Sequence, residues 1–99
     1  MTNEQAMNNR RQLISEMQKQ KHRLAPTVRH GSDGTCCAVG LGAELFGCAN
    51  EGVFEYRKVA AALAIKDGYD LSCAFDDGFD IGGVDRAIKN VAKLLDVPL

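Results

Sequence analysis

The sequence lacks any long hydrophobic run, since its longest uninterrupted apolar stretch is VAAALAI, residues 59–65. A helix that crosses a membrane needs about 20 mostly apolar residues, so the sequence predicts no membrane span. The opening stretch MTNEQAMNNRRQ is polar and lacks the apolar centre of a secretory signal. We therefore expect a cytoplasmic protein that does not associate with a membrane.

The four cysteines form neither a CxxC pair nor an evenly spaced disulfide framework. Structural zinc sites draw their cysteines mainly from CxxC-like pairs, so we expect no metal site. We expect reduced thiols, with Cys37, Cys48 and Cys73 buried as small apolar side chains. Cys36 is the candidate reactive thiol, because a cysteine in a first helical turn faces the positive end of the helix dipole, which favours the thiolate.

The stretch GTCCAVGLGAELFG, residues 34–47, has a Gly-x-Gly but lacks the third glycine of a dinucleotide-binding loop, because Leu45 stands at that position. No alternating strand and helix pattern surrounds it, so we expect neither a nucleotide nor any other cofactor. The steps of four residues from Cys37 to Leu45 predict a helix instead. Gly40 and Gly42 each cost a helix about 1 kcal/mol relative to alanine, so we expect another helix to approach closely here.

Apolar residues recur at helical spacing in most of the chain, which predicts an all-α fold. Examples are Leu13 and Met17 on the apolar face of the first expected helix, Val59 on that of the third and Ile81 on that of the last. The expected architecture is a compact single domain, residues 1–99, of about four helices with an Asp-rich loop before the last helix.

Residues 69–75 alternate as a strand does, but no second strand is available to pair with them, so a short helix or irregular segment is favoured. Gly68 is expected to end the third helix, and DDGFD, 76–80, to form a turn in which Asp80 caps the last helix. The four expected helices lie within residues 3–24, 35–48, 53–68 and 81–96. A loop is expected over residues 26–35, and fraying at residues 1–5 and 97–99.

Charge is distributed unevenly along the chain. Residues 1–30 contain six basic and two acidic residues, a net charge of +4, whereas residues 31–99 contain six basic and eleven acidic residues, a net charge of −5. Such bipolarity suits a nucleic acid at one end, a basic partner at the other, or ends that face each other within the fold. The candidates for nucleic-acid binding are Arg10, Arg11, Lys19 and Arg23. The candidates for protein binding are Asp76, Asp77 and Asp80.

Two short motifs stand in a fixed order along the chain. Cys36, Cys37 and Gly40 form Cys-Cys-x-x-Gly, and LSCAFDDG, residues 71–78, precedes the last expected helix. This order resembles a group of small bacteriophage and prophage proteins that have Leu-Asn-Asp-x-Gly in the second motif, where Asp76 here replaces the asparagine. The resemblance implies a phage or mobile-element origin, a bacterial host and a mostly helical fold, but no activity.

Two functions of different classes follow as hypotheses. The first is an accessory protein that binds a host or phage protein, in the manner of many phage modulators. The second is a nucleic-acid-binding module that uses the basic N-terminal helix. An enzyme, dependent on a thiol or a metal, ranks third, because no nucleophile, base and orienting group can be assembled from the sequence, and we therefore assign no catalytic residue.

Overall fold

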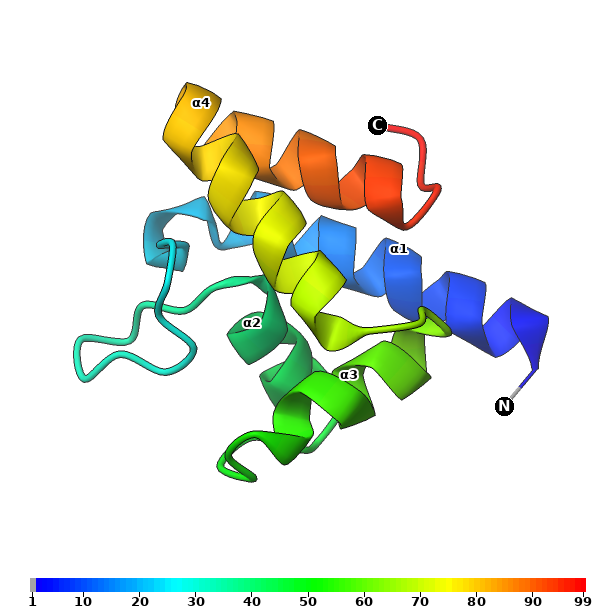
Figure 1. Ribbon diagram of the computed structural model, residues 1–99. Coiled ribbons are helices and arrows are strands. Elements are labelled where there is room, and N and C mark those ends of the chain that lie inside the picture. Colours follow the sequence, from blue (N-terminus) through cyan, green and yellow to red (C-terminus); the bar gives the residue numbers. More distant parts are fainter. Residues whose placement is uncertain (1) are drawn as a thin grey trace.

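The computed structural model describes residues 2–99, and within them the chain forms helices and no strand. Each of the four α-helices packs against the other three, which confirms the expected all-α single domain (Figure 1). Among the described residues, no helix has the length and apolarity needed to cross a bilayer. The helices are α1 Asn3–Lys19, the short 3-10 helix η1 Lys21–Arg23, α2 Ala38–Leu45, α3 Phe54–Leu63 and α4 Gly68–Leu94.

Helix α1 begins where the sequence offers a cap, because the Thr2 hydroxyl accepts a hydrogen bond from the Gln5 backbone N–H at 3.1 Å. Its apolar stripe is buried as expected, with Leu13 and Met17 inaccessible to solvent. The helix ends at Lys19, earlier than predicted, and η1 completes the segment before the loop that contains Pro26.

Helix α2 occupies the centre of the core, and its glycines do admit close neighbours. A Cβ atom at Gly42 would lie 2.9 Å from a methyl group of Val59 on α3, which confirms the expected helix–helix approach. At Gly40 the neighbour is instead the loop that connects η1 to α2, residues 24–37. A Cβ atom at Gly40 would lie 1.9 Å from the Arg29 carbonyl oxygen in this loop. Cys37 is buried, as expected, but α2 starts only at Ala38.

Helix α3 ends earlier than predicted, at Leu63, because Ala64 adopts the left-handed conformation with φ of 54°. Gly68 does not supply the stop; it begins α4, after Asp67 has capped the helix through the Tyr69 backbone N–H. A side chain at Gly68 would meet the Tyr56 carbonyl oxygen at 2.3 Å, so glycine allows α4 to start directly against α3.

Helix α4 is a hairpin of two limbs, residues 68–81 and 84–94, which fold back on each other in Figure 1. The break lies at Gly82 and Gly83, and Gly83 has a φ of 76° that glycine adopts without strain. A Cβ atom at Gly78 would lie 2.8 Å from the Ala87 Cα atom, so glycine also lets the two limbs cross closely.

The expected Asp-rich turn at residues 76–80 is therefore wrong, because these residues are helical and lie in the first limb. Asp77–Gly78 is a common turn sequence, but here Gly78 is buried at a helix crossing rather than exposed in a turn. Asp80 accordingly does not cap the last helix, and Ile81, expected on its buried face, is 72% exposed at the hairpin tip. Residues 69–75 are helical, as favoured.

Candidate functional site

A stacked pair of tyrosines joins α3 to α4 at the surface. The rings of Tyr56 and Tyr69 lie 4.3 Å apart at an interplanar angle of 12°. The Arg29 guanidinium from the loop lies over the Tyr56 ring, 5.0 Å from its centre, at a distance that permits a cation–π interaction. Two grooves flank this stack, and both are lined by Val53, Tyr56 and Tyr69.

The apolar groove, of about 560 Å³, runs between α3 and the start of α4. Three large apolar side chains are exposed around it, Val53 at 67%, Phe54 at 57% and Tyr69 at 54%. Among the described residues only three others of this kind are exposed, Ile81, Leu94 and Leu99. Half of the exposed large apolar side chains therefore gather at one groove. It is lined by Val53, Phe54, Tyr56, Arg57, Ala60, Ala61, Ile65, Lys66, Asp67, Gly68 and Tyr69.

The polar groove, of about 650 Å³, lies on the other side of the stack, between the loop and the first limb of α4. The Asp76 carboxylate accepts a hydrogen bond from the Thr27 backbone N–H at 3.2 Å, and Arg29 donates to the Gly52 carbonyl at 2.8 Å. These contacts connect three segments that are distant in sequence. The groove is lined by Thr27, Arg29, His30, Cys37, Val53, Tyr56, Tyr69, Ser72 and Asp76.

A histidine–glutamate pair borders the polar groove. His30 Nε2 lies 2.5 Å from Oε1 of Glu55, whose side chain is 1% exposed, the only charged side chain among the described residues that is so deeply buried. The pair fixes the loop to the first turn of α3. It is also part of a general-base arrangement, but no hydroxyl or thiol of the described residues hydrogen-bonds to the His30 side chain.

The sequence contained a signal for Glu55 that its interpretation missed. Glu55, Val59 and Leu63 follow each other at steps of four residues, so the carboxylate lies on the buried stripe of α3. A charge in such a stripe requires a partner, but nothing in the sequence identified His30 as that partner.

The structure contradicts the basis on which Cys36 was expected to be reactive. Cys36 precedes α2 instead of lying in its first turn, and its backbone bridges Leu24 beside η1. The residue is 1% exposed, and burial raises the pKa of its thiol from 9.0 to about 11, so it stays protonated at neutral pH. The exposed cysteine is Cys73, which was expected to be buried; Cys37 and Cys48 are buried as expected.

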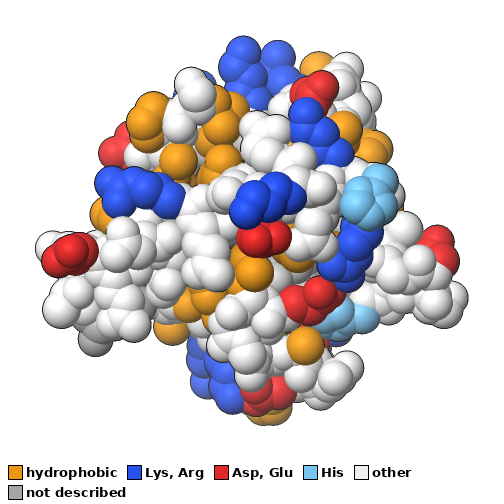
Figure 2. All heavy atoms as spheres, turned by 180° about the vertical axis from the view of Figure 1, so that it is seen from behind, with side chains coloured by type: hydrophobic (Ala, Val, Ile, Leu, Met, Phe, Trp, Pro, Cys, Tyr) orange, Lys and Arg blue, Asp and Glu red, His pale blue; other side chains and the backbone are white. Residues whose placement is uncertain are grey.

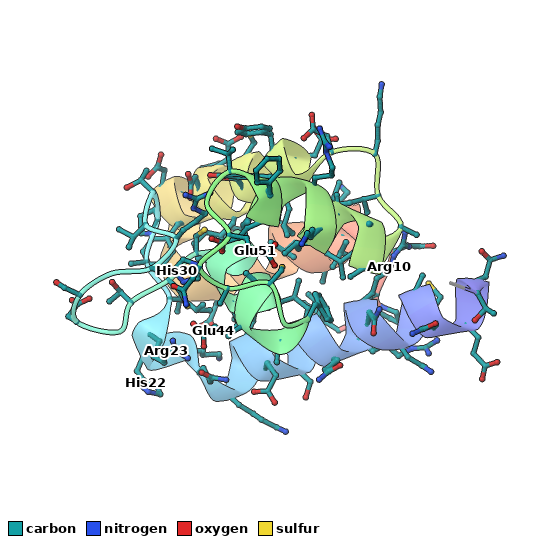
Figure 3. All side chains as sticks on the ribbon, turned by 90° about the horizontal axis from the view of Figure 1, so that it is seen from below. Arg10, His22, Arg23, His30, Glu44 and Glu51 are labelled. Atoms are coloured by element: carbon teal, nitrogen blue, oxygen red, sulfur yellow. The ribbon has the colours of Figure 1, made fainter. Side chains whose placement is uncertain are left out.

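The structure does not bring the four basic candidates together into one patch. Arg10 donates hydrogen bonds to the carbonyl oxygens of Leu63, Ala64 and Leu95, at 2.7, 3.1 and 3.0 Å, at the ends of α3 and α4. Arg23 is the last residue of η1 and lies well apart from Arg10, as Figure 3 shows. Its guanidinium pairs with the Glu44 carboxylate at 2.9 Å.

The remaining basic candidates also lie next to polar or acidic side chains. Lys19 approaches Glu16 at 3.9 Å, and Arg11 is exposed and donates to the Asn8 side chain at 3.3 Å. On the face drawn in Figure 2, basic side chains alternate with acidic and apolar ones and form no continuous basic surface. A nucleic-acid backbone would meet no uninterrupted run of cations on this face.

The three acidic candidates all lie on the first limb of α4, where Asp80 is about one helical turn from Asp76 and Asp77. Asp77 and Asp80 are exposed, whereas Asp76 is half-buried and lines the polar groove. Among residues 2–99 no three His, Cys, Asp or Glu side chains are close enough to bind a metal ion together.

Comparison with known proteins gives no assignment for this arrangement. No known protein family, no curated protein and no solved structure matches the chain.

Proposed function

We propose that the protein is a small binding module that acts by binding another protein through the surface around its apolar groove. The observation that carries this proposal is the clustering of Val53, Phe54 and Tyr69, all more than half exposed, around one concave site. A soluble domain rarely gathers exposed apolar side chains without a use for them, and aromatic side chains are enriched at protein interfaces.

The acidic residues fit this proposal unequally. Asp76 lies in the polar groove beside the tyrosine stack and is therefore close to the proposed surface. Asp77 and Asp80 line neither groove. We propose a host or phage protein as the partner, in keeping with the resemblance to phage and prophage proteins.

Binding to nucleic acid through α1 is the weaker alternative. Arg10 contacts three carbonyl oxygens and Arg23 pairs with Glu44, which leaves Arg11 and Lys19 as the more accessible cations. Affinity for a duplex that falls steeply as salt rises, and that is lost in Arg11→Glu, would favour this alternative.

The proposal is tested by comparing two exposed apolar sites. Val53→Ser/Phe54→Ser changes the groove, whereas Ile81→Ser changes the hairpin tip, where the side chain is 72% exposed. Each variant, immobilised beside the parent, is used to capture partners from a host lysate, and each captured protein is purified and tested for direct binding. We expect a direct partner that the groove variant loses and Ile81→Ser retains. A partner bound equally by all three proteins would refute the proposed surface.

A further inference from the structure

We infer that the apolar groove recognises a peptide segment of the partner that carries a large apolar side chain next to one or more carboxylates. This inference rests on the proposed function, and it adds the chemistry of the partner. It follows from the shape of the groove, from its rigidity and from the charges at its rim.

The shape of the groove suits one large apolar anchor. Small residues line it, since Ala60 and Gly68 are buried and Ala61 adds only a methyl group. Val53, Phe54 and Tyr69 project around them with more than half of each side chain exposed. The volume of about 560 Å³ falls within the range of about 300–1,000 Å³ that is typical of ligand sites.

The walls of the groove are held in place before any partner binds. Gly68 brings the start of α4 directly against the Tyr56 backbone, and the stacked rings of Tyr56 and Tyr69 join the two helices. Asp67 fixes the first turn of α4 by accepting a hydrogen bond from the Tyr69 backbone N–H at 2.9 Å. A preformed groove does not have to be ordered on binding, which favours affinity for a short segment.

The rim of the groove carries a local excess of free positive charge. Arg57 and Lys66 line it, both are exposed, and neither makes an ion pair or side-chain hydrogen bond with the described residues. The only acidic lining residue, Asp67, already caps α4. By contrast, the cations Lys21, Arg23 and Lys58 each pair with a carboxylate. Carboxylates next to the anchor would therefore complement this rim.

A nucleic acid is the other anionic macromolecule that this rim would attract. The groove favours a peptide, because only two of its eleven lining residues, Arg57 and Lys66, are cations, whereas a nucleic-acid strand is held by a positively charged groove that follows its successive phosphates. An oligonucleotide therefore serves as a competitor in the test.

The test is a selection from a library of random short peptides displayed on a carrier. The parent protein is screened in parallel with Arg57→Glu/Lys66→Glu and with the matched control Arg86→Glu/Lys89→Glu, which makes the same charge change at exposed sites outside both grooves. Peptides that require Val53 and Phe54 are identified by counter-screening against Val53→Ser/Phe54→Ser. Selected peptides are then synthesised, and their affinities are measured by fluorescence anisotropy with and without a single-stranded oligonucleotide.

We expect groove-dependent peptides in which a Leu, Ile, Phe or Trp anchor is flanked by Asp or Glu. Their affinity should fall at least about tenfold in the rim variant and stay nearly unchanged in the control. Groove-dependent peptides without acidic flanks, equal loss in both charge variants, or displacement by the oligonucleotide would each overturn the inference while leaving the proposed surface standing. If no peptide depends on Val53 and Phe54, the proposed function falls together with the inference.

Discussion

Glu55 shows how a single residue can hold a loop in place. Its carboxylate lies in the apolar stripe of α3 and lies 2.5 Å from His30, which comes from the loop that borders the polar groove. A buried carboxylate without a partner is far less stable than a paired one, so the loop is anchored where His30 meets it.

Replacing His30 therefore tests the anchor. His30→Ala removes the partner and should lower the free energy of unfolding by about 2–4 kcal/mol, because the Glu55 carboxylate stays buried without its contact. Glu55→Gln removes the charge but keeps hydrogen-bonding capacity, so it should cost about 1 kcal/mol. Urea denaturation followed by circular dichroism measures both. Equal stability of His30→Ala and the parent would show that the contact contributes nothing.

The buried thiols predict a second residue-level behaviour, in alkylation. Cys73 is exposed, whereas Cys36 is buried and its pKa is raised to about 11 by burial. Iodoacetamide should therefore modify Cys73 first in the native protein at neutral pH, and Cys36 only after unfolding. Peptide mass spectrometry after short exposures identifies the order. Modification of Cys36 as fast as Cys73 would show instead that Cys36 is a reactive thiol in the folded protein.

The same raised pKa predicts a loss of stability in alkaline solution. The folded protein keeps the Cys36 proton up to about pH 11, whereas the unfolded chain releases it near pH 9.0. The free energy of unfolding is therefore unaffected by this group below pH 9.0, and it falls as pH rises from 9.0 toward about 11. Urea denaturation across this range should show a smaller fall in Cys36→Ala than in the parent. An identical fall in both proteins would exclude this source.

At the scale of the helices, glycine sets how closely the elements approach. Gly40 lets the backbone of α2 approach the loop, and Gly42 lets it approach α3. Gly78 likewise lets the two limbs of α4 cross closely. Each glycine weakens its helix, so its place in the core reflects contact with a neighbour.

The two α2 glycines should respond differently to alanine. At Gly40 the new methyl group would meet the fixed Arg29 carbonyl oxygen at 1.9 Å, so Gly40→Ala should cost about 3 kcal/mol or more. At Gly42 it would meet side-chain atoms of Val59 and Phe46 and no backbone atom, and the better helix propensity of alanine should keep the change within about 1 kcal/mol. Thermal denaturation measures both variants.

The larger Gly42→Leu variant extends this comparison. Leucine cannot fit between α2 and Val59, so this variant should fold poorly. A Gly42→Leu protein as stable as the parent would show that the close packing of α2 and α3 is not required.

At the scale of the whole molecule, some basic residues of the N-terminal segment form ion pairs with acidic residues from the rest of the chain. Lys21 pairs with Asp85 at 2.8 Å and Arg23 with Glu44 at 2.9 Å, so the basic N-terminal segment meets the acidic remainder of the chain. Such exposed pairs contribute little to stability, but they occupy cations that a nucleic acid would otherwise contact.

Arg10 connects three helices of the molecule. Its guanidinium projects from α1 to the carbonyl oxygens of Leu63, Ala64 and Leu95, where the helix dipoles of α3 and α4 concentrate negative charge. Arg10→Ala should therefore lower the free energy of unfolding by at least about 2 kcal/mol, whereas Arg11→Ala should stay within about 0.5 kcal/mol of the parent. Chemical denaturation of the two variants measures the difference. Equal effects would mean that Arg10 is merely another surface cation.

The sequence by itself determined the class of the fold and most of the core. Apolar residues at helical spacing placed Leu13, Met17 and Val59 inside, because the period of a helix depends only on local backbone geometry. The small residues of α2 likewise indicated a close neighbour, but not which one.

Only the tertiary structure decided where the last helix turns and where the candidate surface lies. Asp77–Gly78 and Gly82–Gly83 are both acceptable turns locally, and the crossing of the two limbs at Gly78 selects the second. The apolar groove depends on the approach of α3 and α4 at Gly68, and the His30–Glu55 contact on a loop 25 residues away in sequence. Contacts between distant residues arise from packing, which no local pattern encodes.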